Sequence, residues 1–309
     1  MKYIICLMLA MSVVGGVQAQ DFHDWKVNFK IVDEAGQPIQ GAEATVFYDR
    51  MAMPDKSIDP GKITGLTDAD GAFMASHHDR TYGLRFRVQK DGYYSTDWTE
   101  DFHRIFSPEK LNRNLNLVLK KIGKPIAMYA KKAINLKLPE FGKPIGYDLM
   151  VGDWVAPYGK GGSSDIILKK DYYEKASNDY YSKVTVSFPK TGDGIQLFTP
   201  SEAEIGSSFC STHEAPADGY QPELTRETSA SPGQPSKVEY DASRVYFFRV
   251  RTALDHNGNV VSAHYGKIYG DFMTITYYLN PTPSDRNIEF DPKQNLLGGI
   301  ESFEQVSAP

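Results

Sequence analysis

Alternation of apolar and polar residues with a period of two runs through most of this chain and constrains its fold more than any other feature. Residues 27–31 read VNFKI and residues 84–88 read LRFRV, and the same alternation recurs at 115–119, 134–138 and 184–188. Because successive side chains of a strand point to opposite faces, this pattern predicts strands that are buried on one side. No comparable pattern has helical spacing, so we expect an all-β protein.

Turn-forming residues separate the alternating segments. Residues 36–42 read GQPIQGA, residues 67–73 read TDADGAF and residues 90–93 read KDGY. Proline fixes φ and suits a turn exit, whereas glycine accepts the positive φ that tight turns require. Short strands joined by such turns are typical of β-sandwiches.

The same residues resemble the carboxypeptidase regulatory-like domain, which belongs to the transthyretin-like (prealbumin-like) group of sandwiches. The resemblance rests on the three turn motifs and on the closing strand LNLVL at 115–119, and it covers residues 24–121. It implies a seven-stranded Greek-key prealbumin-like sandwich. Domains of this family are appended to many secreted proteins, including peptidases and outer-membrane receptors. The resemblance therefore indicates a fold and leaves the function open.

The first 19 residues are typical of a secretory signal peptide. A basic Lys2 precedes an apolar run that is too short to span a bilayer, and Val17-Gln18-Ala19 has the small residues of a cleavage site after Ala19. No later apolar run reaches the length of a membrane span. We therefore expect an exported protein, periplasmic, at the cell surface or secreted, with no transmembrane segment after cleavage.

The second half of the chain is expected to be another β-rich, sandwich-like domain, and no family is recognised for it. Residues 122–145 contain Gly-Lys-Pro-Ile twice and are interpreted as a linker to a domain at 146–298. Residues 211–236, rich in Pro, Ser, Thr and Glu, are interpreted as an irregular insertion, and 299–309 as a flexible tail. Strands are expected at 146–155, 164–170, 182–188, 194–199, 245–254, 260–278 and 287–290.

Several chemistries find no support in the sequence. A net charge of −5 argues against a nucleic-acid partner. No His is followed three positions later by Glu, no serine lies in Gly-x-Ser-x-Gly, and no P-loop is present. Cys210-Ser-Thr-His213 is either a thiol–imidazole pair or a buried cysteine beside a loop histidine, and the adjacent His77 and His78 would point apart in a strand. We assign no catalytic residue, metal ligand or cofactor.

Aromatic residues at strand ends and in loops are the remaining candidates for binding. We assign Tyr94, Trp98, Tyr172 and Tyr173 as ligand-binding residues, because an exposed ring offers an apolar face with a polar tip. Such rings suit a glycan or a surface protein, and the alternative is that they pack in the core. The sequence thus favours a non-catalytic binding module of the envelope or cell exterior.

Two alternatives stay open. The first is a hydrolase with an unrecognised acidic site in the second domain, for which Asp148, Asp153, Asp165 and Asp271 are candidates. The second is a structural component of a surface matrix.

Overall fold

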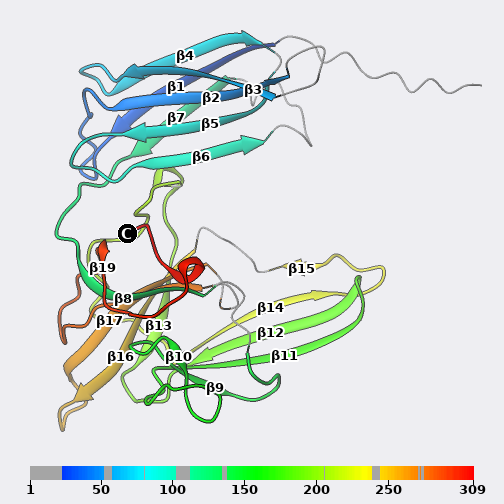
Figure 1. Ribbon diagram of the computed structural model, residues 1–309, viewed down its shortest axis with the longest axis vertical. Coiled ribbons are helices and arrows are strands. Elements are labelled where there is room, and N and C mark those ends of the chain that lie inside the picture. The colour runs from blue at the N-terminus through cyan, green and yellow to red at the C-terminus, as the bar shows by residue number, and fades with distance from the viewer. Residues whose placement is uncertain are drawn as a thin grey trace, which may run out of the picture.

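The chain folds into two β-sandwiches that follow one another along the long axis of the molecule (Figure 1). The computed structural model describes residues 23–51, 58–79, 81–101, 112–133, 138–204, 206–238, 244–270, 272 and 275–309. These residues form nineteen strands and the short 3₁₀ segments η2 (Glu202–Glu204) and η3 (Ser302–Glu304). The prediction of an all-β fold is confirmed. The expected signal peptide with Ala19, and residues 134–137 of one expected strand, lie outside the described residues.

The first sandwich has seven strands in two sheets, the number that the family resemblance implied. The three-stranded sheet has the order β4 (Ala72–Asp79), β1 (His23–Val32), β7 (Asn112–Val118), and the four-stranded sheet has the order β3 (Ile58–Leu66), β2 (Glu43–Met51), β5 (Thr81–Gln89), β6 (Thr96–Asp101). The chain passes between the sheets after β1, β3, β4 and β6, so strands that follow one another often lie in opposite sheets. Connections of this kind are characteristic of Greek-key sandwiches.

The predicted alternation builds the first core. Val27, Phe29 and Ile31 of β1 face Leu84 and other apolar residues of β5, and all of them are almost completely buried. The polar residues between them point outward, as the period of two requires.

The turn at Gly71 shows why its sequence is constrained. Gly71 has a φ of +71°, and a Cβ at this position would lie 2.3 Å from the carbonyl oxygen of Ile31. The Asp68 carboxylate accepts the N–H groups of Asp70 and Ala72 and closes the turn. The Asp-x-Asp-Gly motif is therefore a turn that packs against β1.

The second sandwich consists of two six-stranded sheets. One has the order β10 (Asp153–Trp154), β9 (Ile145–Asp148), β11 (Ile166–Ala176), β12 (Asp179–Ser187), β14 (Glu223–Ala230), β15 (Lys237–Val238), and the other has the order β13 (Gly194–Phe198), β16 (Val245–Leu254), β17 (Val260–Gly270), β18 (Ile275–Leu279), β8 (Ile126–Ala133), β19 (Phe290–Asn295). Beyond the core, β11, β12 and β14 project to one side of the molecule (Figure 1).

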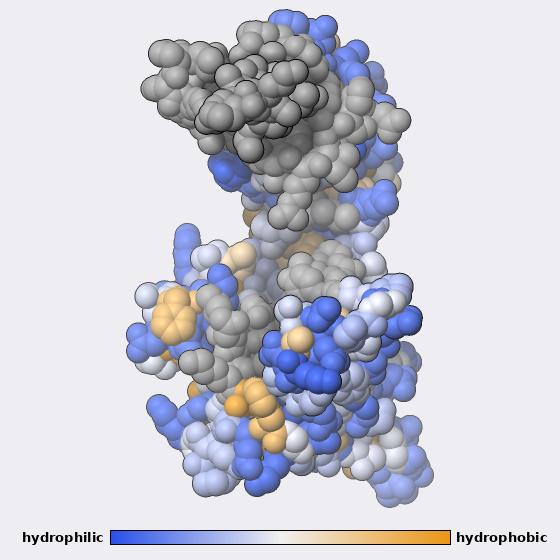
Figure 2. Space-filling model, turned by 90° about the vertical axis from the view of Figure 1, so that its right-hand side faces the viewer, coloured by the Kyte–Doolittle hydropathy of each residue, from blue (hydrophilic) through white to orange (hydrophobic). Residues whose placement is uncertain are grey.

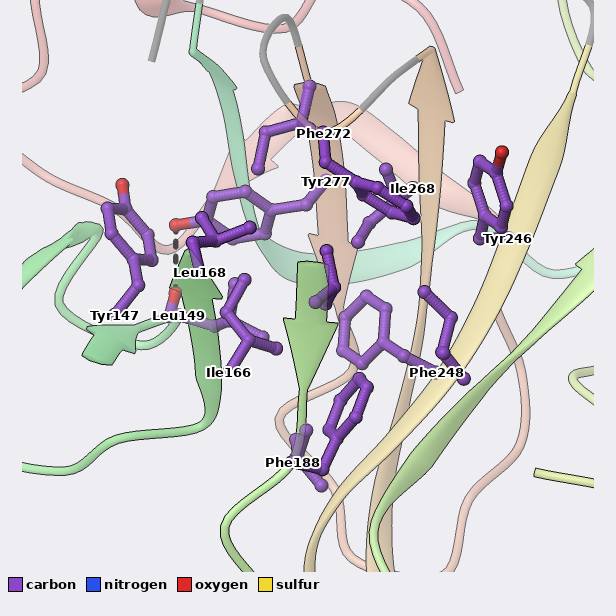
Figure 3. Packing of buried hydrophobic residues seen from close by; sticks show 14 of the residues in the cluster. Tyr147, Leu149, Ile166, Leu168, Phe188, Tyr246, Phe248, Ile268, Phe272 and Tyr277 are labelled. Atoms are coloured by element: carbon purple, nitrogen blue, oxygen red, sulfur yellow. Dashed lines mark hydrogen bonds between the residues drawn. The ribbon is translucent and has the colours of Figure 1, made fainter. Parts of the chain in front are cut away.

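The largest hydrophobic cluster lies between these two sheets (Figure 3). Tyr246, Phe248 and Tyr277 contribute buried rings to it. The Tyr277 hydroxyl donates a hydrogen bond to the carbonyl oxygen of Leu149, 2.9 Å away, so the one polar atom of this ring is satisfied within the core.

The sheet that contains β16 is buried on both faces. Residues 245–248, Val-Tyr-Phe-Phe, are all at most 2% exposed, so the side chains on both faces of β16 are buried. The outer face carries a second cluster in which Phe247 and Tyr265 pack against Ala215 and Val306. A continuous apolar run is the pattern expected of a strand covered on both sides.

This second cluster explains two differences from the sequence-based expectations. Residues 211–236, expected to be irregular, include strand β14, and Ala215 covers the sheet. Residues 299–309, expected to fray, include η3 and place Val306 in the same cluster, where it is only 7% exposed. These segments bury the apolar outer face of the sheet that contains β16, and this burial orders them.

The segment 122–145, expected to be a linker, contains β8. This strand pairs antiparallel with β18 and parallel with β19, so it is internal to its sheet. Met128 and Ala130 lie in the outer cluster, while Tyr129 packs against the inner one. Because both faces are covered, β8 lacks the polar alternation that identifies a half-buried strand.

Candidate functional site

A loop of the second sandwich joins the first sandwich at strand β6. The amide of Asp97 donates to the carbonyl of Gly206, and the amide of Ser208 donates to the carbonyl of Ser95, both at 2.8 Å. Residues 206–208 thus pair with the free edge of β6 through backbone hydrogen bonds. The two sandwiches are therefore connected by backbone contacts as well as by the chain itself.

Phe209 inserts its ring at this junction. It is fully buried and stacks on Tyr94 of the first sandwich, with ring centroids 4.7 Å apart. The ammonium of Lys267 lies 4.2 Å from the Phe209 centroid and that of Lys120 lies 5.9 Å from it. Lys120 also forms a 2.6 Å ion pair with Glu204. The ring is thus held between aromatic and cationic partners.

Glu289 connects the same junction from the other side. Its Oε1 accepts a hydrogen bond from the Tyr94 hydroxyl at 3.0 Å, and its two oxygens accept the amides of Gly123 and Lys124. Burial by itself would raise the pKa of Glu289, but these donors hold it below its ordinary value. Glu289 is therefore an ionised acceptor that ties Tyr94 to the second sandwich.

His213 lies between carboxylates of the two sandwiches. Its Nδ1 is 3.0 Å from Glu289 Oε1 and its Nε2 is 3.2 Å from Glu34 Oε2. Of the two sequence-based interpretations of residues 210–213, the structure favours a cysteine packed among apolar residues: Cys210 is partly buried against the outer cluster, and this burial raises the pKa of its thiol. A raised pKa disfavours the reactive thiolate.

A surface pocket opens beside this junction. Its volume is about 600 Å³. Most of its lining belongs to the first sandwich, and Ser208 comes from the second. The lining residues are Gly41, Glu43, Gln89, Lys90, Asp91, Tyr93, Tyr94, Ser95 and Ser208. Hydroxyl, amide and charged groups with two tyrosine rings make this a polar pocket suited to a ligand rich in hydrogen-bonding groups.

The outer face of the four-stranded sheet meets the pocket at Gln89. Gln89 points outward from β5, as do Arg87 and Arg85, because the intervening residues of this strand are buried. Asp97 of β6 accepts four hydrogen bonds of 2.7–2.8 Å from the two guanidinium groups. The hydrogen bonds from Arg85 are the main cause of the lowered pKa of Asp97.

The four aromatic residues selected from the sequence do not form one site. Tyr94 lines the pocket. Trp98 is partly buried and packs edge-on against Phe86 in the first core. Tyr172 and Tyr173 lie on the projecting strand β11, 44% and 55% exposed. On one face of the molecule, hydrophobic residues form a few separate spots among hydrophilic ones (Figure 2).

Asp148 and Asp165, two of the acidic residues considered for a hydrolase, are engaged in structural contacts. Asp148 accepts the amides of Gly162 and Ser163, and it also binds Arg251. Asp165 binds the same guanidinium with both oxygens. These two carboxylates are thus brought together around a cation rather than left free in a cleft.

Asp153 is the third acidic candidate, and it is also engaged in structural contacts. Asp153 accepts the amides of Trp154 and Lys160 and shapes its own loop. Asp271 lies outside the described residues.

The described parts of the chain offer neither a cluster of metal ligands nor a membrane-spanning helix. No group of three or more His, Cys, Asp or Glu residues there has an arrangement that could hold a metal ion. The His77 ring lies against that of Tyr48 in a tilted arrangement, with centroids 4.9 Å apart, whereas His78 lies 2.7 Å from Asp24, so these neighbours do point apart. No helix in these parts is long and apolar enough to cross a membrane.

Sequence reasoning missed the residues that complete the junction. Ser208, Phe209 and Glu289 lie in irregular segments, and their partners are far away along the chain. The only local signal was the apolar Phe209 within a Ser-rich loop, which is too weak to identify a contact.

No protein-family model matches the sequence, and no curated protein matches it. Among solved structures, it is similar to 3-chlorocatechol 1,2-dioxygenase from Rhodococcus opacus 1CP, at 16% identity and a TM-score of 0.24, over 34% of this chain and 62% of that one. It is also similar to a mutant of the shaft pilin SpaA from Lactobacillus rhamnosus GG, at 12% identity and a TM-score of 0.24, over 56% of this chain and 90% of that one. A streptococcal ancillary pilin matches at 12% identity and a TM-score of 0.22, over 88% of this chain and 62% of that one.

The chain thus spans about three fifths of the length of the dioxygenase and of the ancillary pilin. At such low TM-scores these likenesses carry no argument about function. The class of protein, a chain of two joined β-sandwiches, is defined by its own sheets.

Proposed function

We propose that this protein is an exported, non-catalytic β-sandwich protein of the cell envelope or exterior, and that it binds carbohydrate in the pocket at its domain junction. The proposal of export rests on the features of residues 1–19. The resemblance of residues 24–121 to the carboxypeptidase regulatory-like domain agrees with it, because such domains are appended to secreted proteins.

The observation that carries the binding proposal is the composition of the pocket. Its walls present Glu43, Gln89, Ser95 and Ser208, which together offer donors and acceptors at short spacing, and Tyr93 adds a ring. Saccharides present hydroxyl groups around a ring with apolar faces, and this lining matches both properties. The volume of about 600 Å³ is within the range of small-molecule sites.

Glycan-array screening followed by calorimetry of a retained saccharide tests the proposal. Gln89→Ala should weaken binding roughly fivefold, because one hydrogen bond contributes about 1 kcal/mol. Gln234→Ala, the same exchange at an exposed position between β14 and β15, is the control and should bind as the wild type does. Retention of no saccharide, or equal affinity of all three proteins, would refute a glycan site in this pocket.

A further inference from the structure

The outer face of the first sandwich holds two arginines in a fixed arrangement. Arg85 and Arg87 each direct Nε and Nη2 to Asp97, and their Cζ atoms lie 5.6 Å and 5.7 Å from the centroid of the Phe47 ring. One carboxylate and one ring thus immobilise two guanidinium groups. Two positive charges against one negative charge leave this cluster with a net charge of +1.

Each guanidinium keeps hydrogen-bonding capacity. A guanidinium has five N–H groups, and the bonds to Asp97 engage Nε and Nη2. Within the described residues, Nη1 of Arg85 and Nη1 of Arg87 make no hydrogen bond. The two side chains are 47% and 38% exposed, so solvent and a ligand can reach them.

The cluster lies in line with the pocket. Arg85, Arg87 and Gln89 are alternate residues of β5, so their side chains share one face, and Gln89 lines the pocket. The Cα atoms of alternate strand residues are about 7 Å apart. The Cα atom of Arg87 is therefore about 7 Å, and that of Arg85 about 13 Å, from the Cα atom of Gln89. A ligand longer than one sugar ring can therefore occupy the pocket and reach the arginines.

Guanidinium groups that are already held in place favour anions. Arginine binds carboxylate and sulfate-like oxyanions through paired N–H groups, and its immobilisation lowers the entropy lost on binding. The positive cluster is local, because the whole chain has a net charge of −5. This cluster therefore favours an anionic group on a ligand that reaches β5, whereas Glu43 and Asp91 give the pocket itself no such preference.

We propose that the pocket takes an acidic saccharide whose carboxylate or sulfate group binds Arg85 and Arg87 on the face of β5. This inference rests on the proposed function, since it assumes that a saccharide occupies the pocket. It adds the chemical class of the ligand and identifies the two residues that determine specificity. Phe47 and Asp97 act as positioning residues for the two guanidinium groups.

Matched pairs of neutral and charged glycans test the inference on the full mature chain. Oligogalacturonate and its methyl ester differ in the carboxylate, and dextran sulfate and dextran differ in the sulfate. At low salt, the charged member of at least one pair should bind about tenfold more tightly, and this preference should fall as salt is added. The pair that shows the preference identifies the anionic group.

The variants separate this inference from the proposed function. Arg85→Gln/Arg87→Gln should abolish the preference for the charged member and leave the affinity for the neutral member unchanged. Lys26→Gln/Lys30→Gln removes two positive charges from the outer face of β1 in the opposite sheet and should keep the preference. Circular dichroism and thermal unfolding verify that each variant is folded.

Three outcomes overturn the inference. If each neutral glycan binds as tightly as its charged counterpart, the acidic class is wrong and the glycan pocket stands. If the arginine double variant keeps the preference, the charge is recognised elsewhere on the protein. If neither pair binds, or binding is insensitive to Gln89→Ala, the pocket itself is wrong and the inference falls with it.

Discussion

Single residues show how closely local geometry limits substitution in this fold. Gly71 and Gly36 both have positive φ, at +71° and +75°, but a Cβ at Gly71 meets the backbone of β1 whereas a Cβ at Gly36 meets nothing within 4 Å. Gly36→Ala should cost about 1 kcal/mol, the strain of a left-handed conformation. Gly71→Ala should cost clearly more, about 3 kcal/mol, because β1 must also move.

Denaturant unfolding of the two alanine variants measures this difference. Equal losses at the two positions would mean that the contact with Ile31 is relieved without cost.

Lys267 is a residue whose burial makes stability depend on pH. It is fully buried, and this desolvation lowers the pKa of its ammonium to about 7, while the rings of Phe209, Tyr269 and Tyr278 lie 4.2–5.0 Å from it. An unfolded lysine titrates near 10.4, so between these pH values the unfolded chain holds one more proton. The contribution of Lys267 to the free energy of unfolding therefore rises as the pH increases from 7 to 10.

The variant Lys267→Met removes that dependence. Its stability relative to the wild type should be greatest below pH 7 and should shrink by an amount on the order of 3 kcal/mol towards pH 10. Unfolding at pH 6 and pH 9.5 measures it, with the exposed Lys132→Met as the control. A difference between Lys267→Met and wild type that is the same at both pH values would contradict a titrating Lys267.

Individual strands differ in how well the sequence predicts them, and the cause is their number of buried faces. β1 and β5 each have one buried face, so polar and apolar residues alternate and the strands are predicted correctly. β8 is covered on both faces and was interpreted as a linker. The turn between β16 and β17 carries a local signal, Asn257-Gly258, and Gly258 has the φ of +83° that such a turn between two paired strands requires.

Segments without regular structure also owe their order to burial. The loop 206–222 and the chain after Leu297 cover the outer face of the sheet that contains β16. Their composition is polar and rich in turn formers, which is why they were expected to be irregular or to fray. Nothing in a polar segment indicates which apolar face it will cover, because that face belongs to other strands.

At the scale of the whole molecule, the junction should make the two sandwiches unfold together. Phe209 lies between Tyr94 of the first sandwich and Lys267 of the second, and it is fully buried. Phe209→Ala should cost about 3–5 kcal/mol, the usual cost of deleting a buried phenylalanine, and should remove much of the contact between the sandwiches. We expect the single thermal transition of the wild type to split into two.

Differential scanning calorimetry of the wild type and two variants measures this coupling. Phe303→Ala is the matched control, because Phe303 is 60% exposed and its loss should leave one transition. A single transition in the Phe209→Ala variant, or two in the wild type, would show that this ring does not couple the sandwiches.

The all-β class and the tight turns could be read from the chain, because strand alternation and glycine geometry act between neighbouring residues. Of the pocket, sequence reasoning identified Tyr94 alone. Its partner Glu289 is 195 positions away, and Phe209 and Ser208 come from a loop that carries no pattern. Such contacts form only when both sandwiches have folded and packed against each other. The position of the pocket is therefore decided by the tertiary structure.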